Sequence, residues 1–310
     1  MDFEIVSLNN SDFINYIENN LNKKIIRVKS GKFADSETYI EPLDVSLKNK
    51  NVFVIQQFSF DNKSINDQIA EFLFFTDLIK KSGAKKIYAH LPYLPYSRQA
   101  KYFGSDILGP VNLLGKIFKA ASINFVFSFE LHEGAIKNIF EVPLVEISLI
   151  QFGVDFFNKN KGKLFADKDI CFVSPDEGRA NFIEKIAKMA GRDFAYVKKE
   201  RKDKDKAVAK QLVGEVKNKN VIIIDDIIDT GNTAIGACDL LLDNGAKSVT
   251  GFFAHAVLSK DSVKKMDESG FEDIFITDAV LIGDKLKESK KIKQTSLAYV
   301  FVDYFKDKFL

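Results

Sequence analysis

Short runs of β-branched and aromatic residues recur along the chain, and each is followed by a stretch with the period of an amphipathic helix. The runs are almost continuously apolar, which is typical of strands that helices cover on both faces of a parallel sheet. We expect strands at 52–56, 86–89, 124–129, 170–173, 221–224, 248–254 and 274–277. Helical periods cover 65–81, 111–121, 179–190 and 233–244. This alternation predicts an α/β protein with right-handed crossovers and an open, doubly wound sheet.

Two segments of the chain look like copies of one unit. Each contains an apolar strand, a helical stretch, the tripeptide Gly-Ala-Lys (83–85 and 245–247) and a second strand that ends in Ala-His. In both, glycine suits the positive φ that often ends a helix, and lysine lies near the negative end of the helix dipole. Matching elements on both sides of the tripeptide favour duplication over chance. We therefore expect two domains, 1–148 and 149–298, and the sequence leaves open whether a last helix at 299–310 joins the first domain.

The composition narrows the class of protein. A hydrophobic fraction of 46% with 28% charged residues is that of a globular chain. The formal net charge is only +2, which gives no overall field for nucleic acid or a membrane surface. Two cysteines cannot cross-link a chain of 310 residues, and both lie among apolar neighbours, so we expect reduced thiols. Since no apolar run approaches the roughly 18 residues of a membrane span, we expect a cytoplasmic protein that binds neither nucleic acid nor membranes.

The strongest chemical signal lies directly after the predicted strand 221–224. It combines two adjacent carboxylates, a short loop and the start of a helix, formed by Asp225, Asp226, Asp229, Thr230, Gly231, Asn232 and Thr233. Open parallel sheets bind ligands at the carboxyl ends of their strands. Glycine lets a ligand approach the main chain, and N–H groups at a helix start suit a phosphate, whereas paired carboxylates accept hydrogen bonds from vicinal hydroxyls. The whole pattern favours a sugar-phosphate site over a plain turn with capping polar residues.

This segment resembles the phosphoribosyl diphosphate loop that phosphoribosyltransferases share with ribose-phosphate pyrophosphokinases. Further segments resemble the second family alone: Pro-Tyr-Leu-Pro-Tyr-Ser-Arg-Gln at 92–99, Glu-Leu-His at 130–132 and Ser-Pro-Asp-Glu-Gly at 174–178. Phe-Ala-Asp-Ser-Glu at 33–37 resembles the loop that lies on adenine across a subunit interface in that family. Because order, spacing and length agree over essentially the whole chain, the chain is identified as a member of the ribose-phosphate pyrophosphokinase family.

The resemblance implies a fold and a reaction. The fold is α/β, with two tandem phosphoribosyltransferase-like domains, each a mostly parallel sheet flanked by helices. The implied enzyme transfers the diphosphoryl group of ATP to the anomeric hydroxyl of ribose 5-phosphate, which gives phosphoribosyl pyrophosphate and AMP. The first domain is then the ATP side and the second the ribose 5-phosphate side. The resemblance also implies Mg²⁺ as cofactor and a homo-oligomer, either a dimer or a hexamer.

The resemblance assigns roles to single residues. It implies that ATP is bound by Phe33, Asp35, Glu37, Arg98 and Gln99. It implies that ribose 5-phosphate is bound by Asp225, Asp226, Asp229, Thr230, Gly231, Asn232 and Thr233. The implied metal ligands are His132 and Asp176, and the implied catalytic residues are Lys199 and Arg201. Lys198 is the alternative to Lys199, but only Lys199 places Arg201 in the register of the family.

Three positions depart from the pattern of the family. Ala100 stands where Asp is usual, Ser36 stands where Gly is usual, and Arg179 stands at the second Gly of Ser-Pro-Asp-x-Gly-Gly. Arg179 adds either a clash or a charge to the diphosphate subsite. These changes leave nucleotide affinity and regulation by phosphate or ADP open. A non-catalytic paralogue that regulates an active synthetase is therefore the alternative, but the retained metal, catalytic and sugar-phosphate residues favour the enzyme.

Overall fold

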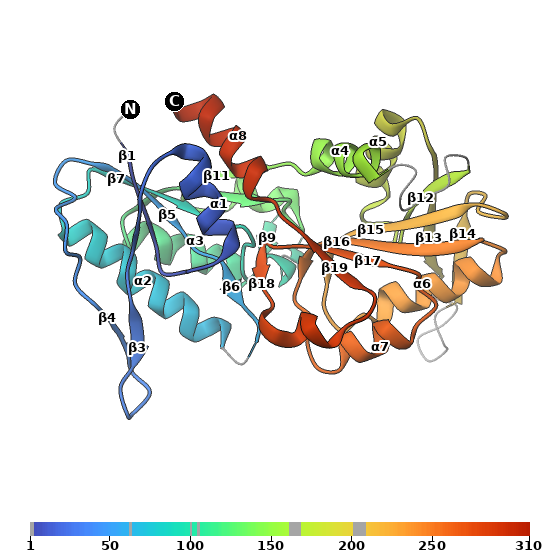
Figure 1. The fold of residues 1–310 in the computed structure, drawn as a ribbon, viewed down its shortest axis with the longest axis horizontal. Coiled ribbons are helices and arrows are strands. Elements are labelled where there is room, and N and C mark those ends of the chain that lie inside the picture. The colour runs from blue at the N-terminus through green and yellow to red at the C-terminus, as the bar shows by residue number, and fades with distance from the viewer. Residues whose placement is uncertain (1–2, 62–63, 100, 104–105, 161–168, 201–208) are drawn as a thin grey trace. The chain divides into compact units, whose positions relative to one another are not determined.

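A computed structural model describes residues 3–61, 64–99, 101–103, 106–160, 169–200 and 209–310 (Figure 1). The chain forms two compact units. The first contains Met1–Ile147, Ala279–Leu281 and Ser296–Leu310, and the second contains Ser148–Asp278 and Ile282–Thr295. Among the described residues, no helix combines the length and the apolar character needed to cross a membrane.

The first unit is built on a six-stranded sheet in which every neighbouring pair is parallel. In spatial order its strands are β11 (Leu144–Ile147), β10 (Ile123–Phe129), β7 (Lys86–His90), β5 (Asn51–Ile55), β1 (Phe3–Ser7) and β2 (Ile25–Arg27). Three short strand pairs lie outside it: β3 (Ser30–Lys32) with β4 (Thr38–Ile40), β6 (Phe58–Ser59) with β18 (Val280–Leu281), and β8 (Lys101–Phe103) with β9 (Asp106–Leu108).

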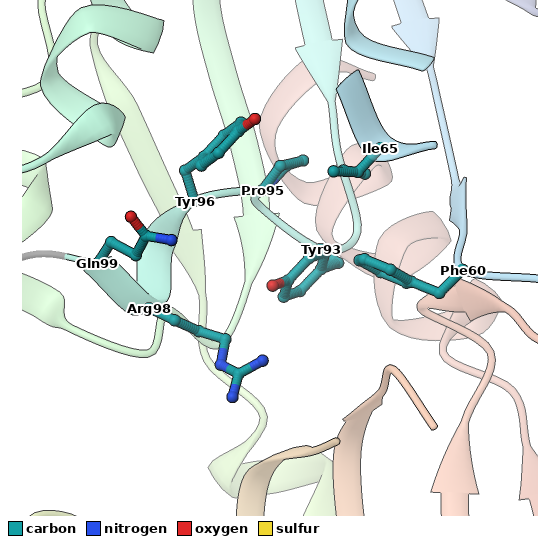
Figure 2. Close-up of a pocket in the computed structure, with 7 residues that line it drawn as sticks. All are labelled: Phe60, Ile65, Tyr93, Pro95, Tyr96, Arg98 and Gln99. Atoms are coloured by element: carbon teal, nitrogen blue, oxygen red, sulfur yellow. The ribbon is translucent and has the colours of Figure 1, made fainter. Parts of the chain in front are cut away.

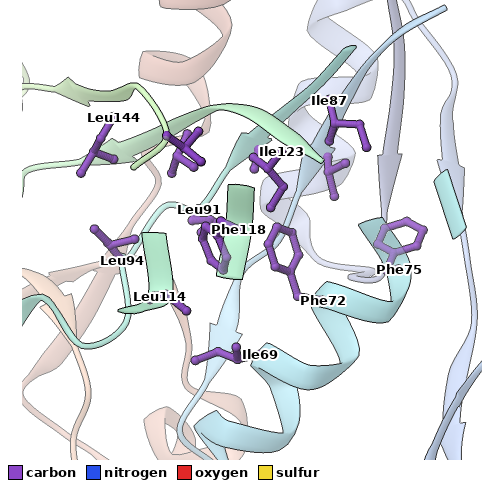
Figure 3. Packing of buried hydrophobic residues seen from close by; sticks show 14 of the residues in the cluster. Ile69, Phe72, Phe75, Ile87, Leu91, Leu94, Leu114, Phe118, Ile123 and Leu144 are labelled. Carbon is purple, nitrogen blue, oxygen red and sulfur yellow. The ribbon is translucent and has the colours of Figure 1, made fainter. Parts of the chain in front are cut away.

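Helices cover both faces of the first sheet because its strands are apolar on both sides. Val52 and Val54 belong to a cluster with α2 (Ile65–Lys81) and α3 (Pro110–Ala120), in which Phe72 and Phe118 meet edge to face (Figure 3). Phe53, between the two valines, contacts α8 (Ala298–Phe309) instead, and α1 (Asp12–Leu21) packs against α8. The last helix therefore belongs to the first unit. Short 3₁₀ helices are η1 (Ser97–Gln99) and η2 (Gly134–Asn138).

The second unit has a seven-stranded sheet that is parallel except for one edge strand, β14, which runs antiparallel to β13. Its order is β14 (Ala209–Val213), β13 (Asp193–Glu200), β12 (Ile170–Ser174), β15 (Asn220–Ile228), β16 (Ser248–Ala256), β17 (Ile274–Thr277) and β19 (Ile292–Thr295). One face packs on α4 (Ile150–Asn160) and α5 (Ala180–Ala190), and the other on α6 (Asn232–Asp243) and α7 (Ser262–Glu268). The 3₁₀ helix η3 (Gly283–Glu288) precedes β19.

The two sheets repeat one topology. When the parallel strands of each unit are numbered along the chain, both sheets read 2-1-3-4-5-6 across. The two Gly-Ala-Lys turns also match: Gly83 and Gly245 have φ of 96° and 83°. Their carbonyls accept equivalent hydrogen bonds, at 2.9 Å from Asn49 N–H and 2.8 Å from Asn218 N–H. The expected pair of like α/β domains with mostly parallel sheets is therefore confirmed.

One expectation about the second sheet was wrong. We placed the end of a strand at residue 224, but β15 continues to Ile228, so Asp225 and Asp226 lie within the strand. The reason is the neighbouring strand β16, which pairs Asp225 with Phe253 and Ile227 with His255. Pairing with β16 compensates for the low strand propensity of the two acidic residues.

Candidate active site

Between β15 and α6 the chain makes a turn that contains a residue in the left-handed conformation, and α6 begins directly after that residue. Gly231, the residue before α6, has φ of 78°, a conformation that favours glycine. A Cβ atom there would lie 3.3 Å from Cγ of Met266, so the turn is also closely packed. Glycine supplies no capping side chain, and the N–H groups of the first turn therefore lack the usual side-chain acceptor from the cap position. Such a helix start binds anions well, and Asn232 and Thr233 are exposed beside it.

Asp225, which is half-buried, and Asp226, which is buried, form an acidic pair next to this turn. Asp226 is 3% exposed, and its N–H donates to Oδ1 of Asp225 at 2.9 Å. Burial, and after it the charge of Asp226, raise the pKa of the Asp225 carboxyl well above its usual range. The pair can thus present a neutral acid beside a carboxylate, which together can donate to and accept from hydroxyl groups.

The loop after β15 is held by the loop after β16. Ser259 donates a hydrogen bond from its hydroxyl to Oδ1 of Asp229. Asp229 and Thr230 are half-buried. The structure therefore brings all seven predicted sugar-phosphate residues together in one strand, turn and helix start.

Asp176 lies at the carboxyl end of β12, the strand next to β15. Its Oδ1 accepts hydrogen bonds from the N–H groups of Gly178 at 3.0 Å and Arg179 at 3.3 Å. The hydroxyl of Ser174 donates to the main-chain oxygen of Asp176 at 2.7 Å. The turn that carries Asp176 is therefore fixed, and its carboxylate also contributes to the raised pKa of Asp225.

Arg179 approaches the acidic pair, which the sequence did not predict. Its Nε lies 4.0 Å from Oδ1 of Asp226, and its side chain is 14% exposed. The guanidinium carbon lies 4.5 Å from the centre of the Phe182 ring. The departure from the family pattern marked Arg179 as unusual, but a sequence carries no sign of which carboxylate lies within its reach.

A pocket of about 430 Å³ in the first unit contains two of the predicted ATP residues (Figure 2). It is lined by Phe60, Ile65, Tyr93, Pro95, Tyr96, Arg98 and Gln99. Figure 2 shows Phe60 and Tyr93 next to one another, and their rings meet edge to face with centroids 5.7 Å apart. Aromatic rings and a guanidinium suit a planar, charged ligand. Our sequence reasoning missed Phe60, since one aromatic residue far from the motif gives no signal.

The other predicted ATP residues lie on the hairpin of β3 and β4 and do not line this pocket. Phe33 is 59% exposed, and its ring centroid lies 5.0 Å from that of Tyr39. The Glu37 N–H donates to Oδ1 of Asp35 at 3.0 Å, which shapes the turn. Ser36 has φ of 74°, so the serine adopts the left-handed conformation that the usual glycine would take more easily.

The predicted metal ligands lie in different units, with His132 exposed after β10 in the first and Asp176 in the second. Within the described part of the chain, no three His, Cys, Asp or Glu residues gather as a metal-binding group. Lys199 lies in β13 opposite Lys210 of β14. Arg201 and the side chain of Lys199 lie outside the described residues.

Comparisons with known proteins agree with the motifs. The N-terminal domain of ribose phosphate pyrophosphokinase matches residues 3–108, and the phosphoribosyl synthetase-associated domain matches residues 184–306. A ribose-phosphate pyrophosphokinase of Campylobacter jejuni is 32% identical over 265 residues, 85% of this chain and 82% of that protein. A second, from Rhizobium meliloti, is 30% identical over 284 residues, 92% and 88% of the two chains.

The fold comparison covers the full length. The crystal structure of phosphoribosylpyrophosphate synthetase from Mycobacterium smegmatis superposes with a TM-score of 0.87 and 27% identity, over 100% of this chain and 99% of that one. Sequence identity, domain matches and the shared fold all agree with the motif order along the chain. The chain belongs to the ribose-phosphate pyrophosphokinase family.

Proposed function

We propose that this protein transfers the diphosphoryl group of ATP to the anomeric oxygen of ribose 5-phosphate, which gives phosphoribosyl pyrophosphate and AMP. The observation that carries this proposal is the strand-to-helix segment, in which the acidic pair of Asp225 and Asp226 lies next to a helix start that has no side-chain cap. The relatives support the same reaction, since they are named ribose-phosphate pyrophosphokinases and this chain matches them over most of their length.

The sugar phosphate binds through the second unit. The 5-phosphate accepts hydrogen bonds from the N–H groups at the start of α6, including those of Asn232 and Thr233, with the Thr230 hydroxyl beside them. Asp225 and Asp226 bind the vicinal hydroxyls of ribose, and Asp229 supports the turn through its hydrogen bond with Ser259. The left-handed Gly231 lets the phosphate approach the main chain closely.

ATP binds through the first unit. Arg98 and Gln99 supply donors in a pocket whose volume, about 430 Å³, is in the range of nucleotide-sized sites. The guanidinium of Arg98 can pair with phosphate oxygens or stack on the base. The exposed hairpin with Phe33, Asp35 and Glu37 completes the adenine site of a neighbouring copy, so the active form is a homo-oligomer, either a dimer or a hexamer.

The reaction needs no covalent intermediate with the protein. The anomeric oxygen of ribose 5-phosphate forms a bond to the β-phosphorus of ATP, and the bond from that phosphorus to the oxygen bridging the α- and β-phosphates breaks. AMP leaves with the bridging oxygen, and the proton of the anomeric hydroxyl passes to solvent. Lys199 and Arg201 stabilise the charge that develops on the phosphoryl oxygens, and binding and electrostatics supply most of the rate acceleration.

Mg²⁺ fits the residues that we assign to it. Mg²⁺ usually takes only one or two protein ligands and keeps water and phosphate oxygens for the rest. Asp176 supplies the carboxylate that such an ion prefers, on a turn fixed by two N–H donors to its Oδ1. We also assign His132, an exposed histidine of the first unit, as a ligand of Mg²⁺. Bound there, the ion would neutralise charge on the nucleotide phosphates.

Formation of AMP tests the proposed function against its alternative. The purified protein is incubated with ribose 5-phosphate, ATP and Mg²⁺, and AMP and phosphoribosyl pyrophosphate are measured. Stoichiometric formation of both products supports the enzyme. A folded protein that forms neither product, but changes the activity of an added active synthetase, is the regulatory paralogue instead.

Both cysteines, Cys171 and Cys238, are buried free thiols, which is consistent with our proposal that the enzyme works in the reducing cytoplasm.

Replacing Glu37 by alanine is expected to raise KM for ATP about tenfold and to leave KM for ribose 5-phosphate within about twofold, because one charge-assisted contact to the nucleotide is lost. Glu37 is exposed on the hairpin, and we assign it no role in binding ribose 5-phosphate. Steady-state kinetics with each substrate varied in turn measures both constants. Glu41→Ala, an exposed acid next to β4, is the control. Equal changes in both constants would contradict the placement of this hairpin.

A further inference from the structure

One arginine connects the two strand ends that carry the acidic residues. Arg179 directly precedes α5, and its main-chain N–H donates to Oδ1 of Asp176 at 3.3 Å. Its side chain extends to the next strand, where Nε lies 4.0 Å from Oδ1 of Asp226. A single residue therefore contacts the turn after β12 through its main chain and approaches β15 through its side chain.

The guanidinium is held from a second side by an aromatic ring. Its carbon lies 4.5 Å from the centre of the ring of Phe182, one turn further along α5. A cation over an aromatic face is stabilised, and the planar guanidinium suits this arrangement. Because the side chain is only 14% exposed, water screens its charge less than it screens a surface arginine.

The contact with Asp226 is an ion pair that can be exchanged. A separation of 4.0 Å between Nε and Oδ1 is longer than a hydrogen bond, so no tight bond holds these two atoms together. Ribose hydroxyls could form hydrogen bonds with the carboxylate oxygens of Asp226 while the guanidinium of Arg179 keeps its contact with the ring of Phe182. The guanidinium would then face the new ligand.

The proposed function places the reacting atoms beside this guanidinium. With the ribose hydroxyls on Asp225 and Asp226 and the nucleotide phosphates towards Asp176, the anomeric oxygen and the β-phosphorus come together between the ends of β12 and β15. Negative charge builds up on the transferred group as the new oxygen–phosphorus bond forms and AMP leaves with the bridging oxygen. A weakly screened cation at this point stabilises that charge.

We propose that Arg179 is a specificity-determining residue that binds the diphosphoryl group once it is joined to ribose, and that Asp226 holds its guanidinium while the site has no substrate. The proposal rests on the proposed function, since it needs ribose on the acidic pair. Arg179 forms no covalent bond and takes no proton in the transfer. It stands directly before α5, whereas Lys199 lies in β13.

Binding of the sugar with and without the diphosphoryl group tests the proposal. We would titrate the full-length protein with ribose 5-phosphate and, separately, with phosphoribosyl pyrophosphate and Mg²⁺, by isothermal titration calorimetry. Arg179→Met is expected to weaken phosphoribosyl pyrophosphate about tenfold or more, because a charge-assisted contact is lost, while ribose 5-phosphate changes less than about threefold. Arg179→Lys should recover part of the affinity, because it restores the charge without the planar fork.

The control is an arginine at the other end of the same helix. Arg192→Met removes the same charge just after α5 and should leave both affinities unchanged. Retained binding of ribose 5-phosphate shows that Arg179→Met is folded. If both ligands weaken equally, Arg179 only orients Asp226 and the proposal is wrong; it is also wrong if neither ligand weakens. If the unsubstituted protein binds neither ligand, the proposed function itself fails, and this inference fails with it.

Discussion

Replacing Asp226 by asparagine is expected to lower kcat/KM for ribose 5-phosphate about a hundredfold, because the ribose hydroxyls lose a charged acceptor. Asp226 is 3% exposed, so water cannot replace the lost contact. The substitution also removes the negative charge that lies 4.0 Å from Nε of Arg179. The loss should fall mainly on the sugar side, with KM for ATP changing little, since the nucleotide pocket belongs to the first unit.

Asp225→Asn is the matched comparison, and it is expected to cost only about tenfold, because a raised pKa favours the uncharged form of the Asp225 carboxyl, which an amide resembles. Burial and the neighbouring Asp226 raise the pKa of the Asp225 carboxyl, so an amide imitates its neutral form. The amide oxygen can also keep the hydrogen bond from the Asp226 N–H, which is 2.9 Å long.

Steady-state kinetics of both variants, with ribose 5-phosphate and ATP varied separately, measures the difference. Circular dichroism checks that each variant is folded. If Asp225→Asn loses as much activity as Asp226→Asn, then the two carboxyl groups do not differ in their protonation, and our interpretation of the pair is wrong. If both variants keep full activity, the acidic pair does not bind the sugar.

The sequence predicted the parts of the fold in which local pattern and long-range packing agree. Strands such as β5 are apolar on both faces, since helices cover both sides of each sheet. The repeated Gly-Ala-Lys predicted the duplication, because a glycine with positive φ is needed at the same turn in both units. Motifs of the sugar-phosphate segment lie within one strand, turn and helix, so their spacing in the sequence already determined which residues come together.

The sequence predicted less where contacts join distant segments. The end of β15 depends on pairing with β16, and the acidic residues in it interrupt the apolar run that would have indicated a longer strand. The amphipathic pattern of α8 does not say which sheet it covers, and long-range contacts such as those of Phe305 with Phe3 and Phe53 place it on the first. The approach of Arg179 to Asp226 joins residues 47 positions apart, which no local pattern can reveal.

His90 makes the first unit sensitive to acid in a way that can be measured. Its ring is fully buried and stacks on Phe301 with centroids 4.3 Å apart, while Phe129 meets it edge to face at 4.9 Å. Burial lowers the pKa of His90 to about 3, whereas in the unfolded chain the imidazole takes up a proton near its usual value of about 6.5. The unfolded state therefore binds more protons between these two values, and stability is lost as the pH falls through that window.

From this group alone we expect the free energy of unfolding to fall by about 2 kcal/mol between pH 6.5 and pH 4.5. Urea unfolding followed by circular dichroism at several pH values gives the slope. His90→Leu should flatten it by that amount, because leucine cannot be protonated in the unfolded chain. A His90→Leu variant with the parent slope would show that the buried ring does not stay neutral, and the aromatic surroundings of His90 would then not suffice to exclude its charge.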